Sequence, residues 1–417
     1  MLELINRFDN TTLIFCATLI LIFISTLIFT NHNVVRLKKY VHISNLILFI
    51  TSLLIITSNN LGHIAILLLW FFVFGYLAKT NLANSESNKK TTFLTLIFDL
   101  ACLFATIFLF LEGFIKYFLL NEIPLIIEQI ANYTYEINLN SMLLAFIGVI
   151  ILISRLFGFF PFNFSLNTHC QNLNPLVLSK QKLYEATLGA SLLLKTYLIF
   201  NQQFELYQNV LIIYFLANTF WFVFTIFKTK NAFKIISASL SFHFGYGLVG
   251  LFCFNEITIA SFVYFCIILI LSHLLIALIF ANLCNNFKTT DITAFKAIGD
   301  KTKIVQIYTM LGLINLLKIA PFGLFVPNVI ICANLFYAQF DDILNTTIYL
   351  IILSLLLFAI SIINLIHKLI SNIQNDKLDF QFKKSEFLIL TLIIFVIIGL
   401  CVCPQYFFNE FIAIEGF

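Results

Sequence analysis

The chain alternates long apolar runs with short polar connections. A membrane-spanning helix needs about 20 mostly apolar residues, and this rule predicts about twelve spans. The predicted spans lie near residues 13–30, 41–57, 62–79, 92–120, 141–160, 183–200, 207–227, 233–253, 258–285, 304–340, 346–370 and 387–404. The period-two alternation of a membrane β-barrel is absent, so the sequence predicts an all-α, polytopic transmembrane helical bundle.

The predicted span 304–340 differs from the others because Pro321, Gly323 and Pro327 fall in its middle. A proline inside a helix removes a backbone donor and clashes with the preceding turn, so we expect two half-helices joined by an irregular segment. Freed peptide groups at membrane depth persist only where protein or a water-lined cavity satisfies them. Interrupted helices of this kind recur in transporters and proton-handling proteins.

The charge of the loops supports this count of spans. Basic loops follow the first, third, fifth, seventh and ninth predicted spans, whereas the loops between them are neutral or acidic. The span 304–340 begins beside a basic loop and ends at Asp341 and Asp342, so it crosses the membrane an odd number of times, most simply once. By the positive-inside rule, the basic loops face the matrix or cytoplasm and both termini lie on the opposite side.

The composition leads to the same class. Of 417 residues, 61% are hydrophobic and 11% are charged, and the mean hydropathy is +1.00, which excludes a water-soluble domain of this size. No soluble domain or long linker is predicted, so residues 1–417 form a single transmembrane domain, with a leading helix at 13–30 and a C-terminal helix at 387–404. The first apolar run is too long for a signal-peptide core and follows an acidic start, which argues against a cleavable leader.

Two features of residue usage bear on origin and on cofactors. The chain has 51 Phe but only 14 Gly and 6 Pro, a bias toward A/T-rich codons, and we infer a strongly A/T-biased genome, most simply that of an organelle. The nine Cys lack the partners that a tetrahedral metal site needs. No nucleotide-binding loop, Rossmann glycine pattern, haem spacing or iron–sulfur spacing occurs, so we predict no redox cofactor in this chain.

Ionisable side chains inside apolar spans are functional hypotheses by default, because burying them in a membrane is costly. Arg155 lies directly before Gly158 and Pro161, where a bend is expected. Glu185 lies on the next apolar helix. Opposite charges on sequential antiparallel helices can pair, and both a structural pair and part of a proton path remain open at this point.

His243 is the best single candidate for a proton relay, because its charge can change near neutral pH and Ser239 and Ser241 supply hydroxyls nearby. The alternative is a buried, hydrogen-bonded histidine without a role in proton transfer. Lys195 and Lys318 are also candidates for a proton path. Both lie within two or three turns of a predicted helix end, where a lysine can extend its amine to the membrane surface.

Other ionisable residues have simpler interpretations. His63 and His273 are interpreted as buried histidines with hydrogen-bond partners. Asp99, deeper in its span, is expected to be protonated or paired with a neighbouring cation. His367 lies close enough to a helix end to reach the membrane surface.

Four segments, in chain order, are similar to the subunit 2 family of NADH:ubiquinone oxidoreductase (respiratory complex I), whose members are antiporter-like. The first is residues 56–79, and the second is residues 155–164, which keep Pro161 and Phe162 of the motif K-x4-P-F-H-x-W. The third is residues 231–251, which keep Ser239, His243, Gly245 and Tyr246 of the motif N-I-K-R-x-L-A-Y-S-S-I-x-H-x-G-Y. The fourth is residues 311–328, which keep Gly312, Pro321 and Gly323 of the motif S-L-A-G-I-P-P-x-x-G-F. The resemblance covers about residues 41–375. The family has fourteen helices, about two more than are predicted here.

The resemblance implies a membrane-arm subunit of complex I in the mitochondrial inner membrane, with the basic loops on the matrix side and both termini in the intermembrane space. Such a subunit contributes to, or structurally supports, proton translocation coupled to NADH oxidation by ubiquinone. NADH, FMN, iron–sulfur clusters and ubiquinone are then expected in other subunits. The implied partners are other membrane-arm subunits, including antiporter-like paralogues, with cardiolipin as a lipid and no nucleic acid. A cation/proton antiporter subunit and a purely structural scaffold subunit are the alternatives.

The chain departs from the family at the residues thought to move protons. The position of the fifth-helix Glu falls on Leu69 or Trp70, and that of the seventh-helix Lys falls near Leu156. The position of the eighth-helix Lys falls on or beside Glu185. The Lys or Glu of the twelfth helix falls on Pro327. Arg155 is a poor substitute for a lysine because it hardly releases its proton. The usual Lys–Glu chain is therefore absent or rebuilt, and weakened or lost translocation is one hypothesis.

Overall fold

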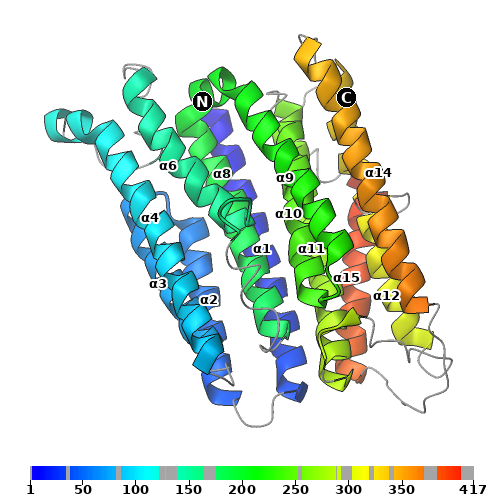
Figure 1. The fold of residues 1–417 in the computed structure, drawn as a ribbon. Helices are drawn as coiled ribbons and strands as arrows, with labels where there is room; N and C mark the ends of the chain where they lie inside the picture. The colour runs from blue at the N-terminus through cyan, green and yellow to red at the C-terminus, as the bar shows by residue number, and fades with distance from the viewer. Residues whose placement is uncertain are drawn as a thin grey trace. The chain divides into compact units, whose positions relative to one another are not determined.

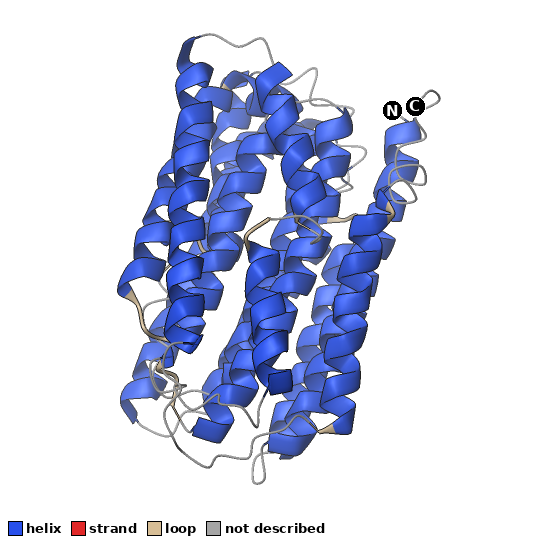
Figure 2. Cartoon of the chain, turned by 90° about the vertical axis from the view of Figure 1, so that its right-hand side faces the viewer, coloured by secondary structure: helices blue, strands red, loops and turns tan. Residues whose placement is uncertain are grey.

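The computed structural model describes residues 2–33, 38–80, 86–121, 127, 139–163, 175–251, 256–287, 289–292, 303–318, 324–337, 342–370 and 383–404. Within these ranges the chain is almost entirely helical (Figure 2). An isolated antiparallel bridge joins Asn231 and Asp291, and Asn60 is a further bridge residue. The prediction of an all-α transmembrane bundle is confirmed.

Every predicted span overlaps a helix or a pair of half-helices. The helices are α1 (Leu2–Asn33), α2 (Lys38–Thr57), α3 (Leu61–Thr80), α4 (Glu86–Asn121), α6 (Leu139–Phe157), α8 (Pro175–Leu206), α9 (Gln208–Lys228), α10 (Ala232–Leu251), α11 (Glu256–Phe287), α12 (Lys303–Leu316), α13 (Phe325–Tyr337), α14 (Asp342–Ile370) and α15 (Lys384–Val402) (Figure 1). Among the described residues, seven helices are long and apolar enough to cross a membrane.

Exposed apolar side chains mark the surfaces that a membrane would cover. Large hydrophobic residues such as Ile66, Trp70, Leu356 and Phe395 are about half exposed or more. A soluble protein rarely shows so many, because contiguous exposed apolar area attracts partners or membranes. In contrast, residues 261–284 of α11 are all buried.

The chain forms two compact units. The first unit comprises Met1–Phe23, Leu37–Leu173 and Tyr184–Leu211, and the second comprises Ile24–Arg36, Asn174–Leu183 and Ile212–Phe417. In the first unit, α3 packs on α2 and α4, and α4 packs along α6. In the second unit, α11 packs on α10, α12, α13 and α15. The single transmembrane domain expected for residues 1–417 stays a prediction.

The predicted span 304–340 is broken, as the sequence indicated. The first half-helix, α12, ends at Leu316, and α13 begins at Phe325. Pro321 and Gly323 lie outside the described residues. Pro327 does not interrupt a helix, which corrects its place in the predicted break. It lies in the first turn of α13, where the missing N–H of a proline would have no helical partner in any case.

The bend expected after Arg155 is the end of a helix. Helix α6 ends at Phe157, and Gly158 follows with a φ of 74°. The Gly158 N–H donates to the Arg155 carbonyl at 3.2 Å, and the Phe159 N–H donates to the Ser154 carbonyl at 2.8 Å. These two bonds make a Schellman motif, which satisfies carbonyls that would otherwise be free at the helix end.

We predict that Gly158→Ala destabilises the protein by about 1–2 kcal/mol, because a Cβ is strained in the left-handed region. The measurement is thermal unfolding of the solubilised protein. Gly399→Ala in α15 is the matched control, since a Cβ there meets nothing within 4 Å and alanine favours a helix. Equal shifts of the unfolding temperature in the two variants would contradict this account of the α6 end.

Candidate functional site

Three buried charged side chains from α4, α6 and α8 meet in the first unit. The Arg155 Nε atom donates to Asp99 Oδ1 at 2.5 Å, and Arg155 Nη1 donates to Glu185 Oε2 at 3.3 Å. The guanidinium of Arg155 is completely buried, and its Cζ atom lies 5.8 Å from the centre of the Phe72 ring. We call Asp99, Arg155 and Glu185 the arginine cluster.

The geometry of the arginine cluster answers one question that the sequence left open. Arg155 and Glu185 do pair, as their positions on successive helices allowed. The closer partner of Arg155 is Asp99, fifty-six residues earlier in the chain. The sequence marked Asp99 only as an acid deep in an apolar span. Its partner depends on the packing of α4 along α6, which the sequence pattern does not specify.

Lys195 lies elsewhere in the first unit and does not extend to the surface. Its side chain is buried, and its Nζ atom donates to the carbonyl oxygens of Ile56 at 2.6 Å, Ser58 at 2.5 Å and Ile55 at 3.4 Å. The expectation that the amine reaches the membrane surface is therefore wrong. The carbonyls at the end of α2 accept hydrogen bonds from the amine in place of water.

Two histidines meet in the second unit, between α10, α11 and the end of α12. The Nδ1 atom of His243 lies 2.7 Å from the Ser239 carbonyl oxygen, and Nε2 lies 3.3 Å from the Leu316 carbonyl oxygen. The Nδ1 atom of His273 lies 2.9 Å from the Leu269 carbonyl oxygen, and Nε2 lies 3.1 Å from Ser239 Oγ. Both rings are completely buried. We call His243, Ser239 and His273 the histidine cluster.

Hydrogen-bond chemistry assigns protons in the histidine cluster. A carbonyl only accepts, so His273 carries hydrogen on Nδ1, and its Nε2 accepts from the Ser239 hydroxyl. His243 differs because both of its ring nitrogens face carbonyl oxygens. A neutral ring can donate to only one of these carbonyls, whereas a doubly protonated ring donates to both. The number of hydrogen bonds that the His243 ring can donate therefore depends on its protonation state.

Lys318 lies at the break, two residues after α12 ends. Its φ of 59° is in the left-handed region, which usually takes glycine at a helix end. Its buried Nζ atom has no hydrogen-bond partner among the described residues and lies 3.3 Å from the centre of the Tyr246 ring. The Tyr246 hydroxyl donates to Asn328 Oδ1 on α13. The expectation that Lys318 reaches the surface is also wrong.

The rings of Phe242 and Phe265 lie 5.8 Å from the Lys318 amine and complete its surroundings on α10 and α11. A positively charged amine at this position would be attracted to the ring faces. A residue other than glycine in the left-handed region costs about 1 kcal/mol, so the backbone at Lys318 is strained at a position where glycine is usual.

Of the other histidines, His273 is buried and hydrogen-bonded, as predicted. His63 is exposed, so its interpretation as a buried histidine is wrong. His367 is exposed, as expected for a residue near a helix end. Sequence reasoning missed Glu386, which is buried and accepts from the Asn282 amide at 3.1 Å, because the predicted span began at residue 387.

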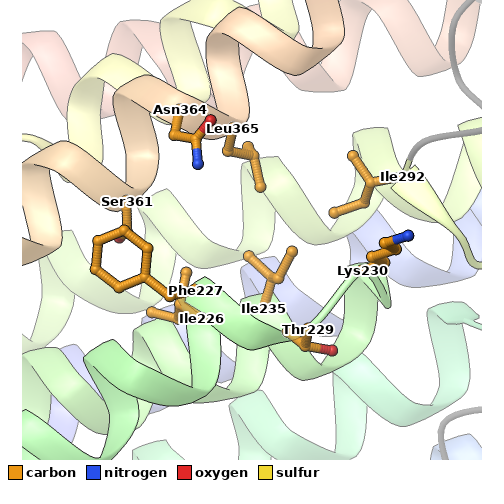
Figure 3. Close-up of a pocket in the computed structure, with 9 residues that line it drawn as sticks. All are labelled: Ile226, Phe227, Thr229, Lys230, Ile235, Ile292, Ser361, Asn364 and Leu365. Atoms are coloured by element: carbon orange, nitrogen blue, oxygen red, sulfur yellow. The ribbon is translucent and has the colours of Figure 1, made fainter.

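Two pockets are lined by described residues. One pocket of the second unit has a volume of about 30 Å³, with Lys230 and Asn364 at its edges and Ile235 between them (Figure 3). This volume admits little more than a water molecule. The other pocket, of about 210 Å³ in the first unit, is almost entirely apolar. Neither contains a member of the arginine or histidine clusters, and no group of metal-ligating side chains occurs among the described residues.

Buried ionisable clusters, a broken helix and apolar outer surfaces define a polytopic membrane protein of all-α class. No protein-family model matches the chain, and no curated protein matches it. Solved structures do share its fold. A chain of respiratory complex I from Thermus thermophilus with bound NADH superposes with a TM-score of 0.80 at 14% identity, over 95% of this chain and 83% of that one.

Two further structures show the same fold. The membrane-bound sulfane sulfur reductase (MBS), an archaeal respiratory membrane complex, gives a TM-score of 0.76 at 15% identity, over 95% of this chain and 81% of that chain. The Mrp complex from Dietzia sp. DQ12-45-1b gives 0.73 at 11% identity, over 96% and 84%. The chain therefore has the antiporter-like fold of membrane subunits in these complexes.

We predict that Asp99→Leu destabilises the protein by about 3–5 kcal/mol, because it removes the closer partner of a buried guanidinium. Thermal unfolding of the solubilised protein measures the effect. Glu112→Leu, at an exposed position on the same helix, is the control and should shift the unfolding temperature little. The ion pair would have no structural importance if the two substitutions gave the same shift.

Proposed function

We propose that the chain is a membrane-arm core subunit of respiratory complex I, of the subunit 2 family, and that it moves protons during NADH oxidation by ubiquinone. The observation that carries the proposal is the histidine cluster beside the break between α12 and α13. Ionisable groups at membrane depth are costly and mark ion or proton pathways. The similarity of residues 231–251 and 311–328 to the subunit 2 motifs supports the same assignment.

In this proposal, His243 is the group that changes its proton occupancy. With one proton on Nδ1, the ring donates to the Ser239 carbonyl, and Nε2 is free to take a second proton. The doubly protonated ring then donates to the Leu316 carbonyl at the end of α12 as well. Arrival of a proton thereby adds a hydrogen bond at the broken helix.

Lys318 is coupled to this step. Its amine and the His243 ring both lie beside the Phe242 ring. Two positive charges repel strongly where little water screens them. Occupancy of one group by an excess proton therefore disfavours occupancy of the other, which is the coupling that a relay requires.

The arginine cluster acts differently. Arg155 hardly releases its proton, so only Asp99 and Glu185 can change their proton occupancy there. The guanidinium orients both carboxylates from α6. In this way the Lys–Glu pairs usual in the family are rebuilt from an arginine and two acids on neighbouring helices.

The membrane and the partners follow from the same proposal. The A/T-biased residue usage indicates an organellar gene and favours the mitochondrial inner membrane. The alternation of loop charge then puts the basic loops in the matrix and both termini in the intermembrane space. NADH, FMN, iron–sulfur clusters and ubiquinone bind other subunits, and antiporter-like paralogues and cardiolipin contact this one.

A cation/proton antiporter subunit is the second candidate, because the fold also matches the Mrp complex. An antiporter is expected to keep the lysine and glutamate positions that here fall on Leu69 or Trp70 and on Pro327. A gene among respiratory genes of an organelle favours the first candidate, and an operon of antiporter genes favours the second. A purely structural scaffold subunit is the third candidate.

The test is the number of protons moved per NADH oxidised by the intact assembly reconstituted in vesicles. We predict that His243→Gln lowers this ratio, because losing a general acid–base slows proton transfer by roughly 100-fold. His367→Gln, an exposed histidine on α14, is the matched control and should leave the ratio unchanged. An unchanged ratio in an assembled His243→Gln complex would replace the proposal with the scaffold function.

Lys318→Gly separates a backbone role from a role of the amine in the same assay. Glycine relieves the left-handed backbone, so the thermal stability should rise by about 1 kcal/mol. The proton-to-NADH ratio should nevertheless fall, because the amine is lost. A rise in stability with an unchanged ratio would show that Lys318 takes no part in the relay.

A further inference from the structure

We propose that the end of α2 is a binding site for a monovalent ammonium group, and that the side chain of Lys195 on α8 occupies it. Lys195 therefore positions helices and carries no proton. Three carbonyl oxygens, those of Ile55, Ile56 and Ser58, surround its Nζ atom. The inference deepens the proposed function, because it removes one candidate from the proton path and gives it another role.

The carbonyls of Ile55 and Ile56 are ones that the helix leaves free, and Ser58 lies directly after the helix end. Helix α2 ends at Thr57, and the last four carbonyls of a helix have no partner within it. The carbonyl end of a helix also carries partial negative charge, which attracts a cation. An ammonium group has three N–H donors, and each of the three carbonyls can accept one of them. Lys195 is 4% exposed, so water does not replace these bonds.

The turn between α2 and α3 also forms hydrogen bonds with other parts of the first unit. The Asn60 side-chain oxygen accepts from the backbone N–H groups of Gly62 at 2.9 Å and His63 at 3.2 Å, which caps the start of α3. The Ile127 N–H donates to the Asn59 carbonyl at 3.0 Å. Lys195 therefore ties α8 to a turn whose other groups bond to the start of α3 and to Ile127.

The position of this turn affects the arginine cluster through α3. Helix α3 carries Phe72, whose ring lies 5.8 Å from the Arg155 Cζ atom. A shift of α3 would change the surroundings of that guanidinium. A fixed charge at Lys195 suits this role, because an ammonium group has three N–H donors for the three carbonyls, whereas a neutral amine has two and would turn its lone pair toward the third carbonyl.

The experiment compares three substitutions in the intact assembly. Lys195→Ala empties the site, and we expect a roughly tenfold shorter half-life at a fixed elevated temperature, since hydrogen bonds to a charged group are the stronger class. Ethylammonium, which has three N–H donors, should restore most of that half-life. Tetramethylammonium, with the same charge and no donors, should not. Lys195→Met fills the space and should not respond to either ion.

Lys195→Arg tests the proton role directly. Arginine keeps a fixed charge and hardly releases a proton, so the proton-to-NADH ratio should stay at the value of the unaltered assembly. A lowered ratio with an unchanged half-life would overturn the proposal and return Lys195 to the proton path. Equal half-lives of the Lys195→Ala variant in the two ammonium ions, or no loss of half-life at all, would also overturn it.

The two proposals fail separately. If His243→Gln leaves the proton-to-NADH ratio unchanged, the proposed function fails, but the half-lives still decide the role of Lys195. If the half-lives in the ammonium ions contradict the cation site, the His243 result still stands. If arginine fits the site poorly and shortens the half-life, the comparison of ethylammonium with tetramethylammonium in the Lys195→Ala variant decides whether the cation site exists.

Discussion

A backbone carbonyl that loses its helical partner in apolar surroundings needs a hydrogen-bond donor from elsewhere, and this requirement explains the described sites. At the end of α6 the donors are the N–H groups of Gly158 and Phe159. At the end of α2 the donor is the Lys195 amine. At the end of α12 the Leu316 carbonyl faces the Nε2 atom of His243. Backbone N–H groups meet this need at α6, whereas polar side chains lie beside the free carbonyls of α2 and α12.

Two further ionisable groups lie near helix ends. Arg155 is on the last turns of α6, and Lys318 just follows the last turn of α12. Both are buried; one aromatic ring lies near the Arg155 guanidinium and three lie near the Lys318 amine. Burying such charges is costly, and the cost is offset by close partners in the arginine cluster and by ring faces around Lys318. A scaffold would be more stable with apolar residues at these positions. Charged residues at these positions agree with the proposed function, in which Arg155 orients two carboxylates and Lys318 interacts with His243.

Much of the fold was predictable because helices in a membrane need long apolar runs and their interruptions need proline or glycine. The spans, the break before α13 and the bend after Arg155 followed from these patterns alone. The sites were only partly predictable. The pairing of Arg155 with Asp99 depends on how α4 packs along α6, and the bond from Lys195 to the end of α2 crosses more than a hundred residues of chain. The left-handed backbone of Lys318 has no sequence signature, since glycine usually takes that place.

The most direct test of the central claim is a density map of the intact, membrane-embedded assembly at a resolution that shows side chains and ordered water. The account predicts a helix that ends at Leu316 and resumes at Phe325, with His243 Nε2 beside the Leu316 carbonyl and Lys195 Nζ among the carbonyls at the end of α2. An unbroken helix through residues 304–340, or water in place of these side chains at both helix ends, would contradict it.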